Sequence, residues 1–397
     1  MVDINADGWL DIYVSKLGDY KMHKNTNKLF INYEGKKFVN EASTYGLDFS
    51  GFSTQAAFLD YDQDGDLDCY LLNHSAKDPA QYKPAKIRNQ KDSIAGDVFY
   101  ENVDGKFIDV TKQAGIYNSS IGFGLGIDVV DVNEDRLPDI YIANDFHEQD
   151  YLYINQGNKT FKEQIEASTQ HTSNFSMGCN ITDINNDGLQ DILTLDMKPF
   201  VDSTYKLSGG WENIEIYNFK RSYGYHHQSP RNALQVNLGV QNGIPQFSEQ
   251  ACLYGIEASD WSWSPIIEDF DNDGDQDIFI TNGILRRPND MDFVNFHFDD
   301  PTKSDLEKIQ MMPKGAVSNL YFKKDNESNR FKRSKVGTPS CSTGAAVGDL
   351  DNDGLLEIVV SSINKGIEIL KPNVNENHYL NIKLESNSDN SNALGAK

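Results

Sequence analysis

The chain has 397 residues and a formal net charge of −24, with 60 acidic side chains against 36 lysines and arginines. Nucleic-acid binding depends on basic patches, so this balance argues against it, and it provides no attraction to an anionic membrane. No run of about 18 apolar residues is present, so we expect no transmembrane segment. The length suits two or three ordinary domains or one long repeat array.

A nine-residue acidic pattern occurs six times, in what we call the first to sixth acidic loops. Its form is Asp-x-Asp/Asn-x-Asp-Gly-x-x-Asp/Glu, with arginine instead of glycine in one copy. Oxygen-bearing side chains at positions 1, 3, 5 and 9 of a tight loop suit a hard cation such as Ca²⁺. Glycine at position 6 adopts a positive φ without steric cost. The six loops are residues 3–11, 60–68, 131–139, 183–191, 269–277 and 349–357.

The candidate metal ligands are the side chains at positions 1, 3, 5 and 9 of every loop, and the position-7 carbonyl supplies a further oxygen. On this basis we predict about five or six Ca²⁺ sites. The ligand side chains are Asp3, Asn5, Asp7 and Asp11; Asp60, Asp62, Asp64 and Asp68; Asp131, Asn133, Asp135 and Asp139; Asp183, Asn185, Asp187 and Asp191; Asp269, Asp271, Asp273 and Asp277; and Asp349, Asp351, Asp353 and Glu357.

The six copies differ in ways that predict different affinities. The second and fifth loops have aspartate at all four ligand positions, and we expect them to bind most tightly. Asn5 and Asn185 occupy position 3 of the first and fourth loops, which removes a charge but keeps an oxygen. In the third loop Arg136 replaces the glycine and would need a strained left-handed backbone. Whether that loop holds an ion stays open.

The loops differ from EF-hands. An EF-hand takes its last carboxylate from position 12 and lies between two helices. Here the last carboxylate is at position 9, and the flanking segments are rich in β-branched residues, which favour strands. A loop of this length therefore suits the end of a β-hairpin.

Aligning the chain on the loops reveals a cycle of four predicted strands. A strand rich in small residues enters each loop except the first, a β-branched strand leaves it, and a strand resembling Leu-Tyr-x-Asn follows. Repeated four-stranded antiparallel units indicate an all-β fold, a β-propeller with six visible blades. The first loop begins directly after Val2, so we expect the sequence to start inside a repeat. The fourth strand of each cycle lies around Phe38, Phe107, Phe161, Phe247 or Phe331.

Three of the longer repeats carry insertions, which should extend from one rim of the disc. Residues 76–96 are polar and lysine-rich, and residues 198–231 contain aromatic side chains and a His-His pair. The pattern of residues 286–315 predicts helix, with prolines at the ends of the helical segment. We expect this insertion-bearing face to carry the partner-binding surface.

Three further groups of residues have both a structural and a functional interpretation, and the structural one is favoured for each. The histidine pair could face a ligand or pack on the disc. A polar group after one strand could hold a cation or cap a turn, and a tryptophan pair could stack on sugars or fill space between blades. These groups are His226 and His227; Asp145, His147, Glu148 and Asp150; and Trp261 and Trp263.

The four cysteines lack the spacing of metal or redox sites. Small buried residues are the favoured interpretation of Cys69, Cys179, Cys252 and Cys341, and one or two disulfides stay open. No Gly-x-Ser-x-Gly nucleophile motif and no glycine-rich phosphate loop is present.

The loop and strand pattern resembles the FG-GAP/VCBS repeats of integrin α-subunit propellers and many secreted bacterial proteins. Asn144-Asp145-Phe146, followed by residues 151–161, is particularly similar to the cartilage acidic protein group. Residues 377–384 and 392–396 resemble the opening of an ASPIC/UnbV domain. The resemblance implies a calcium-binding propeller, usually of seven blades, at residues 1–374 and the start of a second domain at residues 375–397. It also implies an extracellular or cell-surface location.

Two functional hypotheses follow. The first is a non-catalytic, calcium-binding interaction module for a protein or glycan. The alternative is a carbohydrate-active enzyme, a lyase or hydrolase, or an accessory glycan-binding subunit, for which the abundant carboxylates give thin support.

Overall fold

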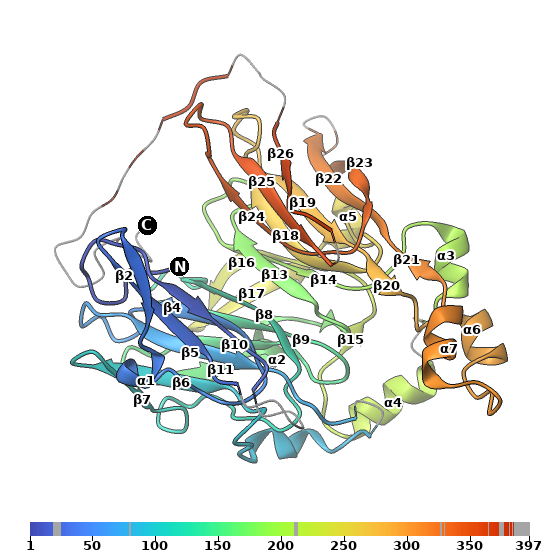
Figure 1. The fold of residues 1–397 in the computed structure, drawn as a ribbon, viewed down its shortest axis with the longest axis horizontal. Coiled ribbons are helices and arrows are strands. Elements are labelled where there is room, and N and C mark those ends of the chain that lie inside the picture. The colour runs from blue at the N-terminus through green and yellow to red at the C-terminus, as the bar shows by residue number, and fades with distance from the viewer. Residues whose placement is uncertain are drawn as a thin grey trace.

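The computed structural model describes residues 1–18, 25–78, 81–209, 213–325, 328, 330–363, 365–372, 377–380, 382 and 384. Its main strands form six antiparallel sheets arranged as a propeller, with the blue first sheet and the red sixth sheet at the two ends of the series (Figure 1). The all-β propeller expected from the repeats is confirmed. Most of the tail that resembles an ASPIC/UnbV domain, including residues 392–396, lies outside the described residues.

Four blades have four strands, and the first and last have three strands within the described residues. Within each blade, successive strands along the chain are neighbours in the sheet, as the four-strand cycle predicts. The blades are β1 (Ile12–Val14), β2 (Lys28–Tyr33) and β3 (Lys37–Asn40); β4 (Ser53–Leu59), β5 (Asp68–Asn73), β6 (Val98–Val103) and β7 (Lys106–Asp109); β8 (Gly124–Val130), β9 (Asp139–Asn144), β10 (Tyr151–Asn155) and β11 (Phe161–Glu163); β13 (Gly178–Thr182), β14 (Asp191–Leu195), β16 (Ala233–Gln241) and β17 (Ile244–Glu249); β18 (Ser262–Glu268), β19 (Asp277–Asn282), β22 (Val317–Asp325) and β23 (Arg330–Ser340); and β24 (Ser342–Gly348), β25 (Glu357–Ser362) and β26 (Glu368–Leu370).

The connections place loops and insertions at opposite ends of the blades. In blades two to six the acidic loop joins the first strand to the second, and in the first blade it precedes β1, which is equivalent to those second strands. The three insertions join second strands to third strands. Because the two connections leave opposite ends of the second strand, the propeller has a loop face and an insertion face. This arrangement agrees with the expectation that the insertions share one rim.

The insertions contain most of the helical residues. Helices α3 (Asp202–Leu207), α4 (Ile214–Ser222), α6 (Met291–Phe296) and α7 (Asp305–Met311) lie together at the right of Figure 1. Ser304 and Glu307 form a capping box that starts α7. The remaining short elements are α1 (Ala42–Tyr45), η1 (Ala85–Asn89), α2 (Ile165–Ser168) and α5 (Ala251–Tyr254), the pair β12 (Thr172–Ser173) and β15 (Gln228–Ser229), and the pair β20 (Ile284–Arg286) and β21 (Lys314–Gly315).

Each pair of successive blades encloses an apolar cluster. Between the fourth and fifth blades, for example, Leu193 and Leu234 pack with Ile278, Ile280 and Leu320, all of them fully buried or nearly so. Comparable clusters join the other neighbouring blades. The strands are therefore apolar on both faces, and burial of that surface is the main favourable term for stacking the blades.

The small residues of the first strands let neighbouring blades approach closely. A Cβ atom on Gly178 of β13 would lie 2.1 Å from the carbonyl oxygen of Trp263 in the next blade. Gly344 of β24, in the last blade, has ordinary backbone geometry, and its Cβ would meet no atom of the described residues within 4 Å. Glycine is thus required by close packing at Gly178 and not at Gly344.

Gly178→Ala is expected to lower the free energy of unfolding by about 3 kcal/mol, the upper end of the usual cost of overpacking. Gly344→Ala should be neutral or stabilise by up to about 1 kcal/mol, because alanine restricts the unfolded chain. Urea denaturation of both variants measures the difference, and equal stabilities would contradict the packing described above.

The second and third blades each have one buried carboxylate that braces the end of the blade at the insertion face. Asp97 accepts hydrogen bonds from the backbone N–H of Asn73 at 2.8 Å and from the Tyr70 hydroxyl at 2.8 Å. Asp150 accepts the equivalent bonds from the backbone N–H of Asn144 at 2.9 Å and from the Tyr141 hydroxyl at 2.7 Å. Burial raises the pKa of both Asp97 and Asp150 to about 7, despite these hydrogen bonds.

Asp97→Asn is expected to weaken the pH dependence of stability between pH 5 and pH 8. The folded-state pKa of Asp97 lies above the unfolded value of about 3.9, so its contribution is present at acid pH and is lost as the pH rises through about 7. The free energy of unfolding at both pH values should change less in Asp97→Asn than in the wild type. The exposed turn variant Asp104→Asn is the control and should keep the wild-type slope.

Candidate metal centres

The six acidic loops share one backbone conformation. Position 4 is left-handed in all of them, with φ between 54° and 62°. Position 6 is also left-handed, with φ from 83° to 101° at the five glycines and 70° at Arg136. The strained backbone expected at Arg136 is therefore present, and the third loop keeps the shape of the others.

The position-1 carboxylate closes each loop. It accepts a hydrogen bond from the backbone N–H of position 6 at 2.7–3.1 Å in all six copies. The negative charge of the carboxylate strengthens such a bond. These six carboxylates belong to Asp3, Asp60, Asp131, Asp183, Asp269 and Asp349.

The position-9 carboxylate lies beneath the loop and is buried in every copy, with at most 4% of the residue exposed. In the first four loops one oxygen accepts the N–H of position 2, and the other accepts the N–H of an asparagine on the third strand, at 2.7–3.2 Å. The side-chain amide of the same asparagine donates to the position-8 carbonyl of the loop at 3.1–3.3 Å. This second contact explains the Asn of the Leu-Tyr-x-Asn pattern, whose role the sequence did not reveal. The four pairs of carboxylate and asparagine are Asp11 and Asn32, Asp68 and Asn102, Asp139 and Asn155, and Asp191 and Asn237.

Burial raises the pKa of these position-9 carboxyl groups, and the backbone hydrogen bonds only partly offset it. The pKa is about 8 for Asp68 and Asp139 and about 7 for Asp191. A carboxylate has about four lone-pair sites, so these oxygens retain capacity for a cation after accepting two N–H bonds.

Position 3 divides the loops into two classes. In the first, third and fourth loops, the asparagine amide nitrogen donates to the carboxylate at position 5, at 3.1, 2.9 and 3.0 Å. The other three loops have aspartate at position 3 and gather three carboxylates, whose oxygens all lie within 4.8 Å of one another. The clusters are Asp60, Asp62 and Asp68; Asp269, Asp271 and Asp273; and Asp349, Asp351 and Asp353.

These three clusters fit a Ca²⁺ ion. Oxygens that each lie about 2.3–2.6 Å from one ion are at most about 5 Å apart, as the carboxylate oxygens are. Asp60 Oδ1 is buried and accepts no hydrogen bond from the described residues, which leaves it available as a ligand. The predicted ligands are thus brought together as tight carboxylate clusters in three loops, whereas the other three use the position-3 amide to offset charge.

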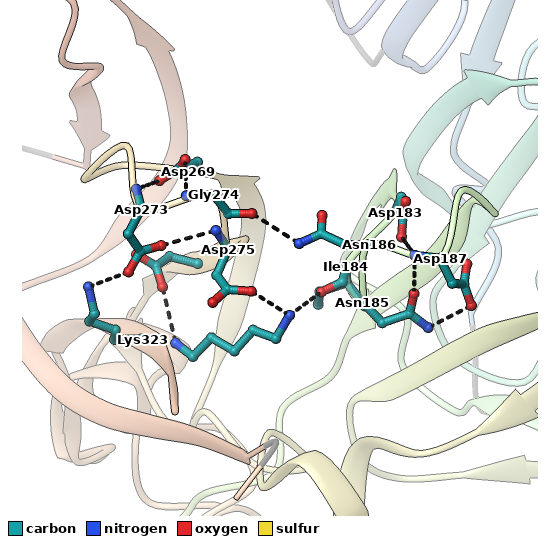
Figure 2. Close-up of polar contacts among 12 residues, drawn as sticks. Asp183, Ile184, Asn185, Asn186, Asp187, Asp269, Asp273, Gly274, Asp275 and Lys323 are labelled. Carbon is teal, nitrogen blue, oxygen red and sulfur yellow. Dashed lines mark hydrogen bonds and ion pairs between the residues drawn. The ribbon is translucent and has the colours of Figure 1, made fainter. Parts of the chain in front are cut away.

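A lysine ammonium group contacts each of the three carboxylate clusters. Lys159 Nζ lies 2.5 Å from Asp62, and Lys323 bonds Asp271 and lies 3.2 Å from Asp273. Lys371 Nζ lies 2.5, 2.6 and 3.2 Å from Asp351, Asp353 and Glu357. Figure 2 shows Lys323 beside Asp273 in the fifth loop. These lysines are far from the loops in sequence, so the spacing of the acidic pattern gave no signal for them.

Amide side chains at position 4 tie some neighbouring loops together. Gln63 donates to the Arg136 carbonyl at 2.8 Å, and Asn272 donates to the Gly354 carbonyl at 3.0 Å. Asn186 donates to the Gly274 carbonyl at 2.9 Å, which joins the fourth and fifth loops in Figure 2. These contacts connect the second to the third loop and the fourth to the sixth along the loop face.

The polar group and His226 lie close together inside the protein. The His226 amide donates to Gln149 at 3.0 Å, and Glu148 forms an ion pair with Arg88 at 2.7 Å. His226 is buried, which lowers its pKa to about 4, whereas His227 is exposed. Asp145, His147 and Asp150 are also buried. These residues brace the segments between blades rather than lining a surface site.

The other flagged side chains also have structural placements. Trp261 is buried, and Trp263 donates its indole N–H to the Gly283 carbonyl at 2.8 Å. All four cysteines are unpaired; Cys69 and Cys341 are buried, while Cys252 is exposed, contrary to the expectation of four buried residues. No helix in the described part of the chain has the length and apolar character needed to cross a membrane.

Comparison with known proteins identifies the repeats. A family model described as an FG-GAP-like repeat matches residues 3–71 and 131–194, which include four of the six acidic loops. The fold is therefore a β-propeller, and these two segments, about a third of the chain, are similar to FG-GAP-like repeats. No curated protein matches the sequence.

Two solved structures show distant similarity. An Agrocybe aegerita lectin, described as recognising non-reducing terminal N-acetylglucosamine, is 12% identical with a TM-score of 0.41, covering 92% of this chain and 82% of the lectin chain. The V. cholerae biofilm matrix protein Bap1 is 12% identical with a TM-score of 0.34, covering 91% of this chain and 41% of Bap1. Similarities this distant do not define a shared function.

Asp191→Ala is expected to destabilise the protein by about 2–5 kcal/mol, with or without Ca²⁺, because it leaves the buried N–H groups of Ile184 and Asn237 without an acceptor. Asp187→Ala, at an exposed position of the same loop, should cost less than about 1 kcal/mol. Denaturation in EDTA and in CaCl₂ measures both variants. Equal costs for the two would contradict a bracing role for position 9.

Proposed function

We propose that this protein is a non-catalytic interaction module whose propeller is stabilised by Ca²⁺ at three of its six acidic loops. The observation that carries the proposal is the gathering of three carboxylates within 4.8 Å in the second, fifth and sixth loops. The proposal is narrower than the five or six sites predicted from the sequence. The other three loops are left out because the side-chain amide at position 3 already donates a hydrogen bond to the position-5 carboxylate there.

The residues that would hold the ions are those at positions 1, 3 and 5, with the position-9 carboxylate beneath them. Bound Ca²⁺ would supply positive charge that offsets carboxylate repulsion on the loop face. Three ions would cancel six of the 24 net negative charges. Because neighbouring loops are joined through Asn272 and Gly354, order imposed on one loop also supports the next.

The insertion face is the proposed partner-binding surface. Its helices α6 and α7 and the turn after α6 expose large apolar side chains, with Phe296, Phe298 and Leu306 at 73%, 55% and 65% exposure. Exposed apolar groups of this kind mark interaction sites on soluble proteins. A protein or glycan partner is consistent with FG-GAP-like repeats, and the buried His226 gives no support to catalysis.

An extracellular or cell-surface location is part of the proposal. Ca²⁺ sites of extracellular modules have dissociation constants of roughly 10⁻⁴–10⁻³ M, which match the calcium levels found there. Exposed loops of mixed carboxylates, carbonyls and water suit this range better than the rigid sites of intracellular buffers.

Millimolar Ca²⁺ is expected to raise the melting temperature, and EDTA should reverse the increase. When the free ion is one to ten times the dissociation constant, a site stabilises the folded state by about 0.4–1.4 kcal/mol. Isothermal titration calorimetry should find three sites with dissociation constants of roughly 10⁻⁴–10⁻³ M. Combining Asp62→Asn, Asp271→Asn and Asp351→Asn should abolish the shift. Combining Asp7→Asn, Asp135→Asn and Asp187→Asn, which removes three charges from the other loops, should leave it. A melting temperature identical in EDTA and CaCl₂ would overturn the proposal.

A further inference from the structure

The three lysines of the loop face occur with a regularity that the repeat pattern does not explain. Each of the three loops with aspartate at position 3 is contacted by one lysine ammonium group. In the three loops with asparagine there, an amide nitrogen donates to the position-5 carboxylate. A loop with one more carboxylate therefore receives a full positive charge in place of a neutral N–H donor.

The lysines reach the loops from different places in the fold. Lys159 lies in the turn after β10 of the third blade and reaches the loop of the second blade, where it also bonds Glu101 at 2.7 Å. Lys323 lies on β22, the third strand of its own blade, and Lys371 follows β26 in the last blade. Lys323 and Lys371 occupy equivalent positions, because each follows the residue that pairs with the first residue after its acidic loop. These pairs are Phe322 with Ile278 and Leu370 with Ile358. Two separate origins, the third strand of the same blade and a turn of the next blade, therefore place a cation at a carboxylate cluster.

A lysine and a divalent ion would compete for the same oxygens. An ammonium group has one charge and three N–H donors, whereas Ca²⁺ has two charges and takes six to eight oxygens. Lys371 Nζ contacts the Oδ2 atoms of Asp351 and Asp353, two of the three carboxylates in the cluster of the sixth loop. The lysine side chains are 38–53% exposed, so they can move into solvent without disturbing the core.

We propose that Lys159, Lys323 and Lys371 are built-in counter-ions that hold the carboxylate clusters closed without metal and are displaced when Ca²⁺ binds. This inference rests on the proposed function. The lysines lower the affinity for Ca²⁺, because binding must break their ion pairs, and they preserve the loop conformation when Ca²⁺ is scarce. They are thus affinity-determining residues outside the acidic motif.

The test compares Lys323→Met and Lys371→Met with two controls in the same blades. Lys332 pairs with Asp325 at 3.0 Å, and Lys365 pairs with Glu368 at 3.4 Å, both outside the acidic loops. Lys332→Met and Lys365→Met therefore remove the same charge without touching a carboxylate cluster. Affinity is measured by calorimetric titration with CaCl₂, and stability by melting in EDTA and in saturating CaCl₂.

Lys323→Met and Lys371→Met should each bind Ca²⁺ about three- to tenfold more tightly at the affected loop. Binding no longer has to break an exposed ion pair, and the lysine charge no longer repels the metal. The melting temperature of each variant should fall in EDTA and match the wild type in saturating CaCl₂. The control variants should keep the wild-type affinity. In an Asp351→Asn background, the effect of Lys371→Met on affinity should shrink.

The alternative outcomes are distinguishable. If the wild type binds Ca²⁺ and the cluster-facing variants bind with unchanged affinity, the counter-ion inference is overturned and the proposed function stands. If only the lysine variants bind Ca²⁺, the lysines replace the metal permanently, which overturns both displacement and the proposed function. If neither wild type nor variants bind, the proposed function fails, and the inference fails with it.

Discussion

The hydrogen bonds from backbone N–H groups to buried carboxylates at the loop ends are the constraint on which the structure depends. An ionised carboxylate inside a protein is costly unless it is paired or hydrogen-bonded. Here Asp11, Asp68, Asp139 and Asp191 each accept one N–H from the start of their loop and one from the third strand. One side chain therefore fixes the hairpin and its register against the next strand.

This bracing has an electrostatic consequence on the loop face. Once the position-9 carboxylate and the position-1 carboxylate are fixed by the backbone, the side chains at positions 3 and 5 are held close to them. The molecule offsets the resulting repulsion in two ways, with an amide in loops such as Asn185–Asp187 and with an ammonium group in loops such as that of Lys371. A divalent ion would be the third way, and it suits only the loops with the additional carboxylate.

The topology separates the acidic loops from the insertions. Loops that enter the second strands occupy one face, and insertions that leave the second strands occupy the other. Bracing at the insertion-face end comes from Asp97 and Asp150, which are buried and bonded to tyrosine and asparagine. The helices α6 and α7 can therefore vary in sequence and length without disturbing the acidic loops, a common arrangement for binding surfaces on rigid scaffolds.

The sequence by itself determined the repeat, the strand order and the six acidic loops, because these depend on local patterns: alternating apolar residues, turn glycines and carboxylates at fixed spacing. It also identified Arg136 as a residue that must adopt a left-handed backbone, as it does. Only the tertiary structure decided which carboxylate oxygens lie close together, because that depends on contacts such as those that Asn5, Asn133 and Asn185 make within their own loops. It alone brought Lys159 to Asp62 and His226 to Gln149, since these contacts join segments far apart in the chain, and no local spacing encodes them.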